Sequence, residues 1–282
     1  MELNIHNIGK KVNKIIVFGG VYSNLQALES LRQNAENEGI SPENIFCSGD
    51  ILGYCAQPIE CINFIQSWGI HAIQGNVEEN IVSGFDECGC NFTEGGRCDI
   101  FSKQWYPFVA SQMNVELLSF LENLPKWIQF TYGGKNITLL HGSASHISEF
   151  IFKSTPWEKK LQQLVMTNSD IILAGHCGIP FIDSNKDKHW INAGVIGMPA
   201  NDGTNDVWFT TLEEYGEKIV CQFHRLVYDF TSAKNKMLAV NLPLSYAHTL
   251  ETGIWDNCEI LPESEMIAQG KIINLDKNSF YL

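Results

Sequence analysis

The sequence predicts an α/β fold, and three observations lead to this class. Short apolar runs rich in strand-forming residues alternate along the chain with stretches of helical periodicity. Several of these runs are apolar at every position, which is typical of strands buried on both faces of a layered protein. Most runs end in Asp, Asn or His, so polar side chains are expected at the carboxyl ends of strands, where α/β proteins carry their sites.

The predicted strands share one pattern. Six runs show it: Lys14–Gly20, Asn44–Asp50, His71–Asn76, Asn136–His141, Asp170–His176 and His189–Gly194. Farther along the chain, residues 207–212 and 218–226 alternate between apolar and polar side chains, with a turn near Gly216 between them. This second pattern predicts a β-hairpin.

Helices are predicted between these strands. Ser23 and Asn24 are good capping residues, and the leucines of residues 25–32 follow them at helical spacing. Further helices are predicted at residues 58–68, 115–124 and 157–166.

Two regions depart from this alternation. Residues 84–110 are rich in glycine and cysteine and are predicted to form an inserted loop. Residues 231–282 are predicted to form short helices interrupted by prolines. We therefore expect one domain over residues 1–230, with residues 231–282 as a C-terminal helical extension packed on it.

Composition and charge restrict the function. The chain has 282 residues, 44% of them hydrophobic and 18% charged, which is typical of a globular protein and excludes general disorder. The net charge of −13 disfavours binding to nucleic acid or to an anionic membrane surface, because both need a cationic excess. The arginines are only Arg32, Arg97 and Arg225, so an arginine cluster is not expected to neutralise a phosphorylated ligand.

The sequence also bears on the compartment. No apolar run reaches the roughly 18–20 residues that span a bilayer. The first run, Ile15–Phe18, is too short for the core of a signal peptide. Nine cysteines, an odd number spread over a long chain, do not resemble a disulfide framework. We therefore expect a cytoplasmic protein.

Four polar residues form the candidate site. Asp50, Asn76, His141 and His176 each stand at the end of a predicted strand, next to a glycine. A single Gly-Asp or Gly-Asn pair more often marks a turn than a ligand, but four such residues at strand ends are expected to converge. One carboxylate, one amide and two imidazoles suit a borderline divalent metal ion such as manganese, iron or zinc.

In order and spacing, these residues resemble the motifs of the calcineurin-like metallophosphoesterases. That family has D-x-H, G-D, G-N-H-[DE], a single H and G-H-x-H, and the matching segments here are Gly49-Asp50, residues 75–78, His141 and residues 175–178. Residues 21–28, 49–54 and 192–199 resemble the bacterial branch related to diadenosine tetraphosphate and serine/threonine phosphatases. The resemblance covers about residues 14–212 and implies a four-layer α/β/β/α sandwich of two mixed sheets flanked by helices.

The departures from the family pattern fall mainly on one half of the site. Where the family has D-x-H, this chain has Gly20, Val21 and Tyr22. Gly178 replaces the second His of G-H-x-H, and Val77 replaces the His of G-N-H. The ligands that belong only to the family's first metal are therefore missing, while those of its second metal are present. The resemblance implies one divalent ion per chain, held by the four residues of the candidate site.

The vacated half could receive the phosphate of a substrate. Gly20 follows a strand and precedes the predicted helix start at Ser23 and Asn24, where backbone N–H groups can face an anion. The Tyr22 hydroxyl could donate to a phosphate oxygen, ligate iron as a phenolate, or simply fill the space. We predict that Gly20, Tyr22, Ser23 and Asn24, together with Asn76, contact the phosphate.

The sequence therefore predicts a metal-dependent phosphoesterase, with Asp50, His141 and His176 as its catalytic residues. It would hydrolyse a phosphomonoester, a phosphodiester or a dinucleoside polyphosphate. The missing metal and Val77 should lower the rate, which favours one selective small phosphorylated or nucleotide ligand. Two alternatives remain: a weak or inactive member of the fold that binds such a ligand, and an enzyme of another type whose metal only positions its substrate. A homo-oligomer is left open, and neither nucleic acid nor a membrane is an expected partner.

Cys88, Cys90 and Cys98 lie in the predicted loop and leave several interpretations open. Their spacing differs from that of zinc knuckles, so a structural metal and a redox pair stand beside simple packing as alternatives. We expect these thiols to be reduced. We also expect the loop to fold near the mouth of the site, because it begins soon after Asn76.

Overall fold

The computed structural model describes residues 5–90 and 92–282. Residues 1–4 of the predicted domain and residue 91 of the predicted loop lie outside this part. The strands form two six-stranded sheets. The first sheet has the order β1 (Ile5–Lys10), β5 (Trp127–Tyr132), β6 (Lys135–Leu139), β7 (Ile171–Ala174), β9 (Lys188–Asn192) and β8 (Phe181–Asn185). The second has the order β12 (Ser279–Tyr281), β11 (Lys218–Leu226), β10 (Val207–Tyr215), β2 (Ile15–Phe18), β3 (Ile45–Cys47) and β4 (His71–Ala72).

Both sheets mix parallel and antiparallel pairs, and they pack face to face through an apolar core. The sequence of β2 shows how this core forms. Ile15 and Val17 lie in the same buried cluster as Phe130 of the opposite sheet, whereas Ile16 and Phe18 pack toward the helices. Because both faces of β2 are buried, every position in this strand is apolar.

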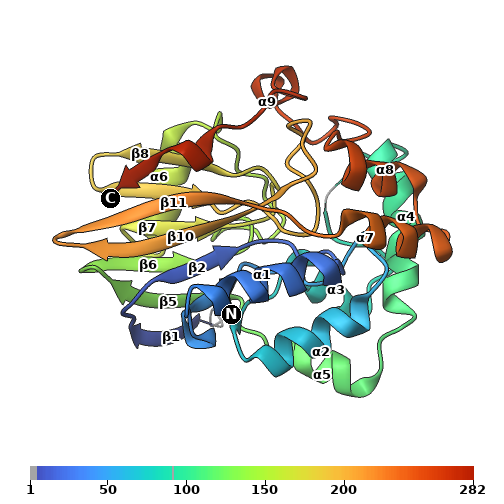
Figure 1. The fold of residues 1–282 in the computed structure, drawn as a ribbon, viewed down its shortest axis with the longest axis horizontal. Helices are drawn as coiled ribbons and strands as arrows, with labels where there is room; N and C mark the ends of the chain where they lie inside the picture. The colour runs from blue at the N-terminus through green and yellow to red at the C-terminus, as the bar shows by residue number, and fades with distance from the viewer. Residues whose placement is uncertain (1–4, 91) are drawn as a thin grey trace.

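Helices cover the two outer faces (Figure 1). Helix α6 (Trp157–Met166) packs on the first sheet, where Leu164 meets Ile172 and Trp190. The helices that contribute to the core on the second sheet are α1 (Leu25–Asn37), α2 (Pro58–Trp68), α3 (Asn76–Ser83), α4 (Arg97–Ala110), α5 (Val115–Glu122), α7 (Phe230–Ala239) and α8 (Leu244–Thr252). The short α9 (Glu263–Ile267) has no buried residue. The four layers are those that the family resemblance implied.

Most predicted elements are present. Each of the six predicted strand runs contains a strand, and residues 207–215 and 218–226 form the predicted hairpin. The helices predicted at residues 58–68 and 157–166 coincide with α2 and α6, and α1 begins after its cap at Asn24. Among the elements that were not predicted are β1, β5, β8 and α3, besides α4 and β12.

Two predictions of local structure are wrong in part. The second half of the predicted loop at residues 84–110 forms α4, because Trp105 and Val109 bury one helical face and this packing outweighs the glycine-rich start. At the C-terminus, the sequence predicted only helices, but the chain ends in β12, which pairs with β11 and extends the second sheet.

The C-terminal segment belongs to the layered structure. Met237 of α7 and Leu250 of α8 lie in the same buried core as Leu28 of α1. This segment also reaches the region of the candidate site, which its Tyr246 and Trp255 side chains help to line.

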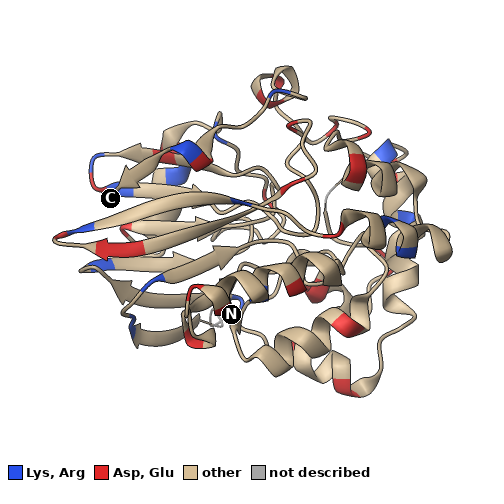
Figure 2. Ribbon diagram, viewed as in Figure 1, with Lys and Arg blue, Asp and Glu red and all other residues tan. Residues whose placement is uncertain are grey.

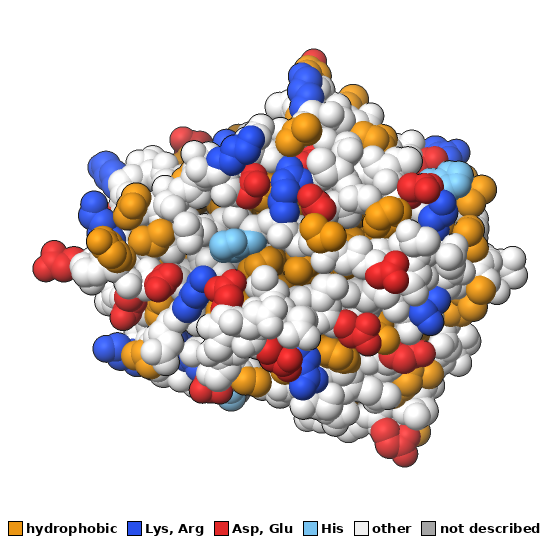
Figure 3. Space-filling view, in the orientation of Figure 1, with side chains coloured by type: hydrophobic (Ala, Val, Ile, Leu, Met, Phe, Trp, Pro, Cys, Tyr) orange, Lys and Arg blue, Asp and Glu red, His pale blue; other side chains and the backbone are white. Residues whose placement is uncertain are grey.

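The surface carries scattered charges (Figure 2). On the face drawn in Figure 3, Lys and Arg side chains lie singly among acidic and apolar ones, without forming a continuous basic area on that face. None of the helices within residues 5–90 and 92–282 combines the length and the apolar character needed to cross a bilayer.

Candidate metal centre

Four strand ends meet between the two sheets. Asp50 follows β3 and Asn76 follows β4, which are parallel neighbours in the second sheet. His141 follows β6 and His176 follows β7, which are parallel neighbours in the first sheet. Carboxyl ends of parallel neighbours share one edge, so each sheet contributes a pair of polar side chains. All four side chains are buried, and the fold brings together the residues that the sequence singled out as ligands.

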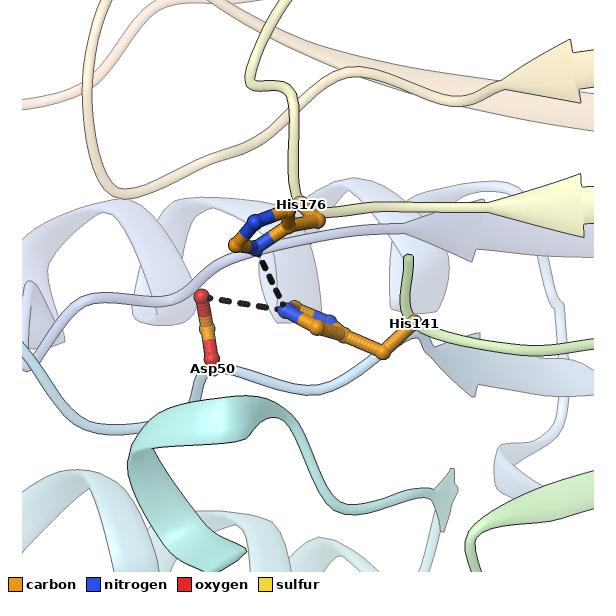
Figure 4. A group of neighbouring side chains, drawn as sticks. All are labelled: Asp50, His141 and His176. Carbon is orange, nitrogen blue, oxygen red and sulfur yellow. Dashed lines mark hydrogen bonds and ion pairs between the residues drawn. The ribbon is translucent and has the colours of Figure 1, made fainter. Parts of the chain in front are cut away.

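His141 lies at the centre of this group (Figure 4). Its Nε2 atom is 3.0 Å from Asn76 Oδ1, 3.1 Å from His176 Nδ1 and 3.3 Å from Asp50 Oδ2. Ligand atoms of Asp50, His141 and His176 all lie within 4.8 Å of one another. One ion could therefore be shared by these side chains.

Hydrogen bonds behind the ligands fix which atoms face the centre. His141 Nδ1 lies 2.7 Å from the carbonyl oxygen of Ser48, so Nδ1 carries the proton and Nε2 keeps a lone pair. The Asn76 amide donates through Nδ2 to the Cys88 carbonyl oxygen and to Cys90 Sγ, which turns its Oδ1 toward His141. Such supporting hydrogen bonds are typical of metal ligands.

The resulting donor set fits a divalent ion. Lone pairs that face one another in a buried space repel unless a proton or a cation lies among them. A proton on His141 neutralises its pair with Asp50 only, whereas one metal ion can accept all four donor atoms. A carboxylate, an amide oxygen and two imidazole nitrogens suit manganese, iron or zinc.

Electrostatics couples the ligands to each other. Burial alone would raise the pKa of Asp50, but the facing His141, together with His176 and the Val77 backbone N–H, more than offsets this and the pKa is lowered. Burial would lower the pKa of His141, but the Asp50 carboxylate reverses this effect and the pKa is raised. Burial, and then the neighbouring His141, lower the pKa of His176 to about 3, so this imidazole is neutral.

The backbone adopts unusual conformations to reach this geometry. Asp50 (φ +53°) and His176 (φ +62°) are left-handed, which costs energy for residues other than glycine and is frequent at functional sites. Gly75 has to be glycine, because a Cβ there would collide with the Asp50 backbone and carboxylate. A Cβ on Gly49 (φ +94°) would in turn lie 2.6 Å from the backbone nitrogen of Gly75. The Gly-Asp and Gly-Asn segments therefore interlock.

Glu78 is a residue of the site that the sequence analysis did not single out. Its buried carboxylate accepts hydrogen bonds from the backbone N–H groups of Asp50, Leu52 and Gly75. Burial, and then the nearby Asp50 carboxylate, raise the pKa of Glu78 to about 7. Glu78 ties the loop after β3 to the start of α3 and so positions Asp50 relative to Asn76. The acidic position at the end of the G-N-x-E segment was the available signal.

Asn192 and Phe150 hold the loop that carries His176. Asn192 Nδ2 donates to the Gly175 carbonyl oxygen (2.6 Å) and to Cys177 Sγ (3.1 Å), on either side of His176 in the chain. The Phe150 ring stacks on the imidazole, with ring centroids 4.1 Å apart. Asn192, the first residue of the segment 192–199 that resembles the bacterial branch of the family, thus has a supporting role.

Aromatic side chains fill the other half of the centre. The Tyr22 ring lies so close over Gly20 that a Cβ at residue 20 would collide with it. The Trp255 ring lies over Gly178, where a Cβ would come within 3.3 Å of it. Val77 is buried and brings no polar side-chain atom. The positions that depart from the family pattern are therefore occupied by packed side chains.

The residues predicted to contact phosphate lie in different settings. Ser23 Oγ accepts a hydrogen bond from the backbone of Gly53, and Asn24 caps α1 and donates to the Gly197 carbonyl oxygen. The backbone N–H groups of residues 22–24 bond to carbonyl oxygens within the protein. This turn therefore does not present those N–H groups to an anion.

Tyr22 faces a cavity next to the ligands. Its ring lines a space of about 80 Å³ that Asp50 and His176 also border. Burial, and then the Asp50 carboxylate, raise the pKa of Tyr22 well above its ordinary value, so the hydroxyl stays protonated. Without a bound cation the hydroxyl is therefore a hydrogen-bond donor, whereas a metal ion at the centre would lower its pKa, and the phenolate ligand stays an alternative.

The cysteine-rich segment lies beside the site, as predicted. Cys88 and Cys90 hold the Asn76 amide, and Cys90 and Cys98 line the cavity. All nine cysteines of the chain are free thiols. Within the described residues, the group of His, Cys, Asp and Glu side chains with metal-ligand geometry is Asp50, His141 and His176, so these cysteines form no separate metal cluster there.

The fold and the site together define a metallophosphoesterase-like α/β protein. Residues 14–214 match the model of the calcineurin-like phosphoesterase superfamily domain, and the chain belongs to this family. An uncharacterized protein of Methanocaldococcus jannaschii is 30% identical over 246 residues, which cover 81% of this chain and 93% of that protein.

Solved structures share the architecture. A metallophosphoesterase from Sphaerobacter thermophilus has a TM-score of 0.67 and 22% identity, covering 86% of this chain and 100% of that one. A hypothetical protein from Pyrococcus horikoshii OT3 has a TM-score of 0.72 and 17% identity, and the match covers 86% of this chain and 99% of that one. At these identities the likeness concerns the fold.

Proposed function

We propose that this protein is a metal-dependent phosphoesterase that works with a single divalent ion. The observation that carries the proposal is the convergence of Asp50, Asn76 and His176 on the Nε2 atom of His141, within 3.0 to 3.3 Å. The proposed ion is manganese, iron or zinc, because the donor set mixes oxygen with imidazole nitrogen. The substrate would be a small phosphorylated or nucleotide compound.

The chain's own residues have distinct tasks in this proposal. Asp50, Asn76, His141 and His176 would hold the ion, which when bound supplies Lewis-acid stabilisation of the phosphoryl group and eases deprotonation of a water molecule. Ser48 keeps His141 in the tautomer that can ligate. The Tyr22 hydroxyl, protonated and facing the cavity, can donate to a phosphate oxygen.

The filled half of the centre sets the expected rate. A second ion would find no side-chain ligand at Gly20 or Gly178, and Val77 offers no proton to a leaving group. Loss of one preorganised electrostatic donor typically lowers kcat by about two to three orders of magnitude. We therefore expect slow turnover of a selected substrate, not a general phosphatase.

Metal analysis together with turnover tests the proposal. We expect at most one tightly held ion per chain by elemental analysis, and hydrolysis of bis(4-nitrophenyl) phosphate after addition of manganese. Two fully occupied metal positions at the site would contradict the single-ion proposal. If the metal-loaded protein hydrolyses no phosphate ester, the proposal that it is an enzyme is contradicted.

A ligand-binding protein is the second candidate function. The specific observation in its favour is the packing of Tyr22 and Trp255 over the glycines at positions 20 and 178, which leaves a cavity but only one set of ligands. Such a protein would be stabilised thermally by a phosphorylated compound without turning it over. Measuring melting temperature and hydrolysis on the same samples separates the two candidates.

A cytoplasmic location is also part of the proposal. Nine free thiols, eight of them buried, are compatible with a reducing cytoplasm. Cell fractionation with a tagged full-length chain checks this location, and size-exclusion chromatography determines whether the protein forms a homo-oligomer.

A further inference from the structure

The cavity beside the candidate metal ligands has an aromatic wall. Asp50 and His176 line it, and so do the rings of Tyr22, Tyr246 and Trp255. Tyr54 also lines the cavity and packs edge-on against both Tyr22 and Tyr246, with ring centroids 4.7 and 4.9 Å apart. Stacked and edge-on contacts of this kind favour an aromatic or otherwise apolar occupant.

Positive charge is absent from the described residues that line this cavity. Its charged side chains are the carboxylates of Asp50 and Asp256. The nearby Arg97 forms a two-pronged ion pair with Asp256 through its Nε and Nη2 atoms, so its charge is already matched. A ligand with several negative charges would find no free cation among these residues.

The ligand set fixes the charge that the centre can offer. Asp50 carries the only ionised group among the four proposed ligands, since an amide and neutral imidazoles contribute no charge. With one divalent ion, the ligand set has at most one net positive charge, and the buried Glu78 carboxylate behind Asp50 lowers the charge that the centre offers further when it is ionised. That charge suits a phosphodiester, which is a monoanion. A phosphomonoester dianion or a polyphosphate would bring negative charge that the centre does not neutralise.

We propose that the site selects phosphodiesters that carry an aromatic or apolar group, and discriminates against phosphomonoesters and polyphosphates. This inference rests on the proposed single-ion function and narrows its substrate class. The physical reason is that unmatched charge in a buried, low-dielectric cavity is costly, whereas an apolar ring gains by leaving water. The aromatic group would lie against Tyr246 and Trp255, and the phosphate would lie toward Asp50 and His176.

Binding of three simple probes tests the inference independently of turnover. Isothermal titration of the manganese-loaded full chain at pH 8 compares diphenyl phosphate, dimethyl phosphate and phenyl phosphate. We expect diphenyl phosphate to bind at least about tenfold more tightly than either of the others. Dimethyl phosphate controls for charge, because it keeps the monoanion and lacks the rings. Phenyl phosphate controls for the ring and adds one charge.

A charge variant at the rim sharpens the test. Asp256→Asn removes one carboxylate from the cavity wall and frees Arg97, so the affinity for phenyl phosphate relative to diphenyl phosphate should rise about three- to tenfold. The matched control is Asp170→Asn, which removes a similarly half-buried carboxylate paired with Lys188 and does not line the cavity. The control should leave the ratio unchanged.

The outcomes separate this inference from the proposed function. Equal or tighter binding of phenyl phosphate or dimethyl phosphate overturns the substrate class, even if the protein is an active esterase. Failure to bind any of the three probes also overturns it. Selective binding of diphenyl phosphate without hydrolysis of bis(4-nitrophenyl) phosphate supports the inference and overturns the enzymatic function. Selective binding together with hydrolysis supports both.

Discussion

The two halves of the centre are built in different ways. In one half, four polar side chains converge on a point, and surrounding residues support them: Glu78 bonds to the Asp50 backbone, backbone carbonyl oxygens accept from His141 and Asn76, and Asn192 and Phe150 hold the loop of His176. In the other half, the Tyr22 ring covers Gly20 and the Trp255 ring covers Gly178. Both halves lie at strand ends of the same two sheets.

The contrast shows how one fold can keep part of a site and rebuild the rest. The polar half uses only residues within 14–214, the part of the chain that matches the family model. The aromatic half also uses Tyr246 and Trp255, which lie beyond that part in the C-terminal segment. The glycines at positions 20 and 178 are therefore not mere losses, because other side chains occupy the space above them.

The largest expected effect is on the polar half. Asp50→Asn removes the only charged ligand, so we expect metal content to fall below detection and kcat/KM to fall by at least about 100-fold. His176→Ala should act in the same way. Elemental analysis and steady-state kinetics measure both, with Asp187→Asn, an exposed carboxylate in the turn between β8 and β9, as the control. Unchanged turnover in Asp50→Asn would place the activity elsewhere.

Restoring a missing ligand tests whether aromatic side chains block a second metal ion or whether the second position lacks only its ligands. Gly178→His should not raise the metal content above one ion, because Trp255 occupies the space. It should also lower the free energy of unfolding by about 1–2 kcal/mol for the left-handed backbone, and by about 1–3 kcal/mol more for crowding. Gly216→His has a similar φ without neighbours and isolates the backbone cost. A second bound ion in Gly178→His would contradict the conclusion that aromatic side chains occupy this half of the centre.

Removing the Tyr22 hydroxyl changes a single polar atom of the aromatic half, so a smaller effect is expected. Tyr22→Phe should leave the metal content intact and weaken activity or ligand affinity by about tenfold, the contribution of one hydrogen bond to a charged group. Tyr106→Phe is the control. The hydroxyl of Tyr106, a residue of α4, donates to the Phe85 carbonyl oxygen, and Tyr106 does not line the cavity. Loss of the metal in Tyr22→Phe would show that this oxygen is a ligand.

The smallest effect concerns the metal-free protein and pH. The raised pKa of His141 means that the folded state holds a proton there more tightly than the unfolded chain does, so this stabilisation is present below pH 6.5 and is lost as pH rises through the folded pKa. The raised pKa of Glu78, about 7, acts in the same direction, whereas the lowered pKa of His176 acts in the opposite direction, mainly below pH 6.5.

We therefore expect the melting temperature of the metal-free protein to fall by a few degrees between pH 6.5 and pH 8, since about 1 kcal/mol shifts Tm by roughly 2–4 °C in a chain of this size. Calorimetry measures the shift. Saturating manganese should abolish it, because the ion takes the place of the proton, and Asp50→Asn should reduce it. A metal-free protein that becomes more stable over this range would contradict the proton shared by Asp50 and His141.

The fold class and the polar half follow from local sequence. Runs such as Ile15–Phe18 are apolar at every position because both faces of the strand are buried, and that pattern is visible without a structure. Asp50, Asn76, His141 and His176 could be found because polar residues at the ends of such runs converge whenever the strands lie side by side. The helix at residues 97–110 was hidden by the glycine-rich stretch before it.

Tertiary structure decided most of the aromatic half, for which the sequence indicated only Tyr22. Trp255 meets Gly178, and Tyr246 reaches the cavity with Tyr22, only after the C-terminal segment has packed on the layers. An aromatic residue carries no mark in the sequence that distinguishes a core position from a cavity wall, because hydrophobic burial is non-directional. The sequence thus determined which ligands remain, whereas the long-range packing of apolar side chains determined what replaced the missing ones.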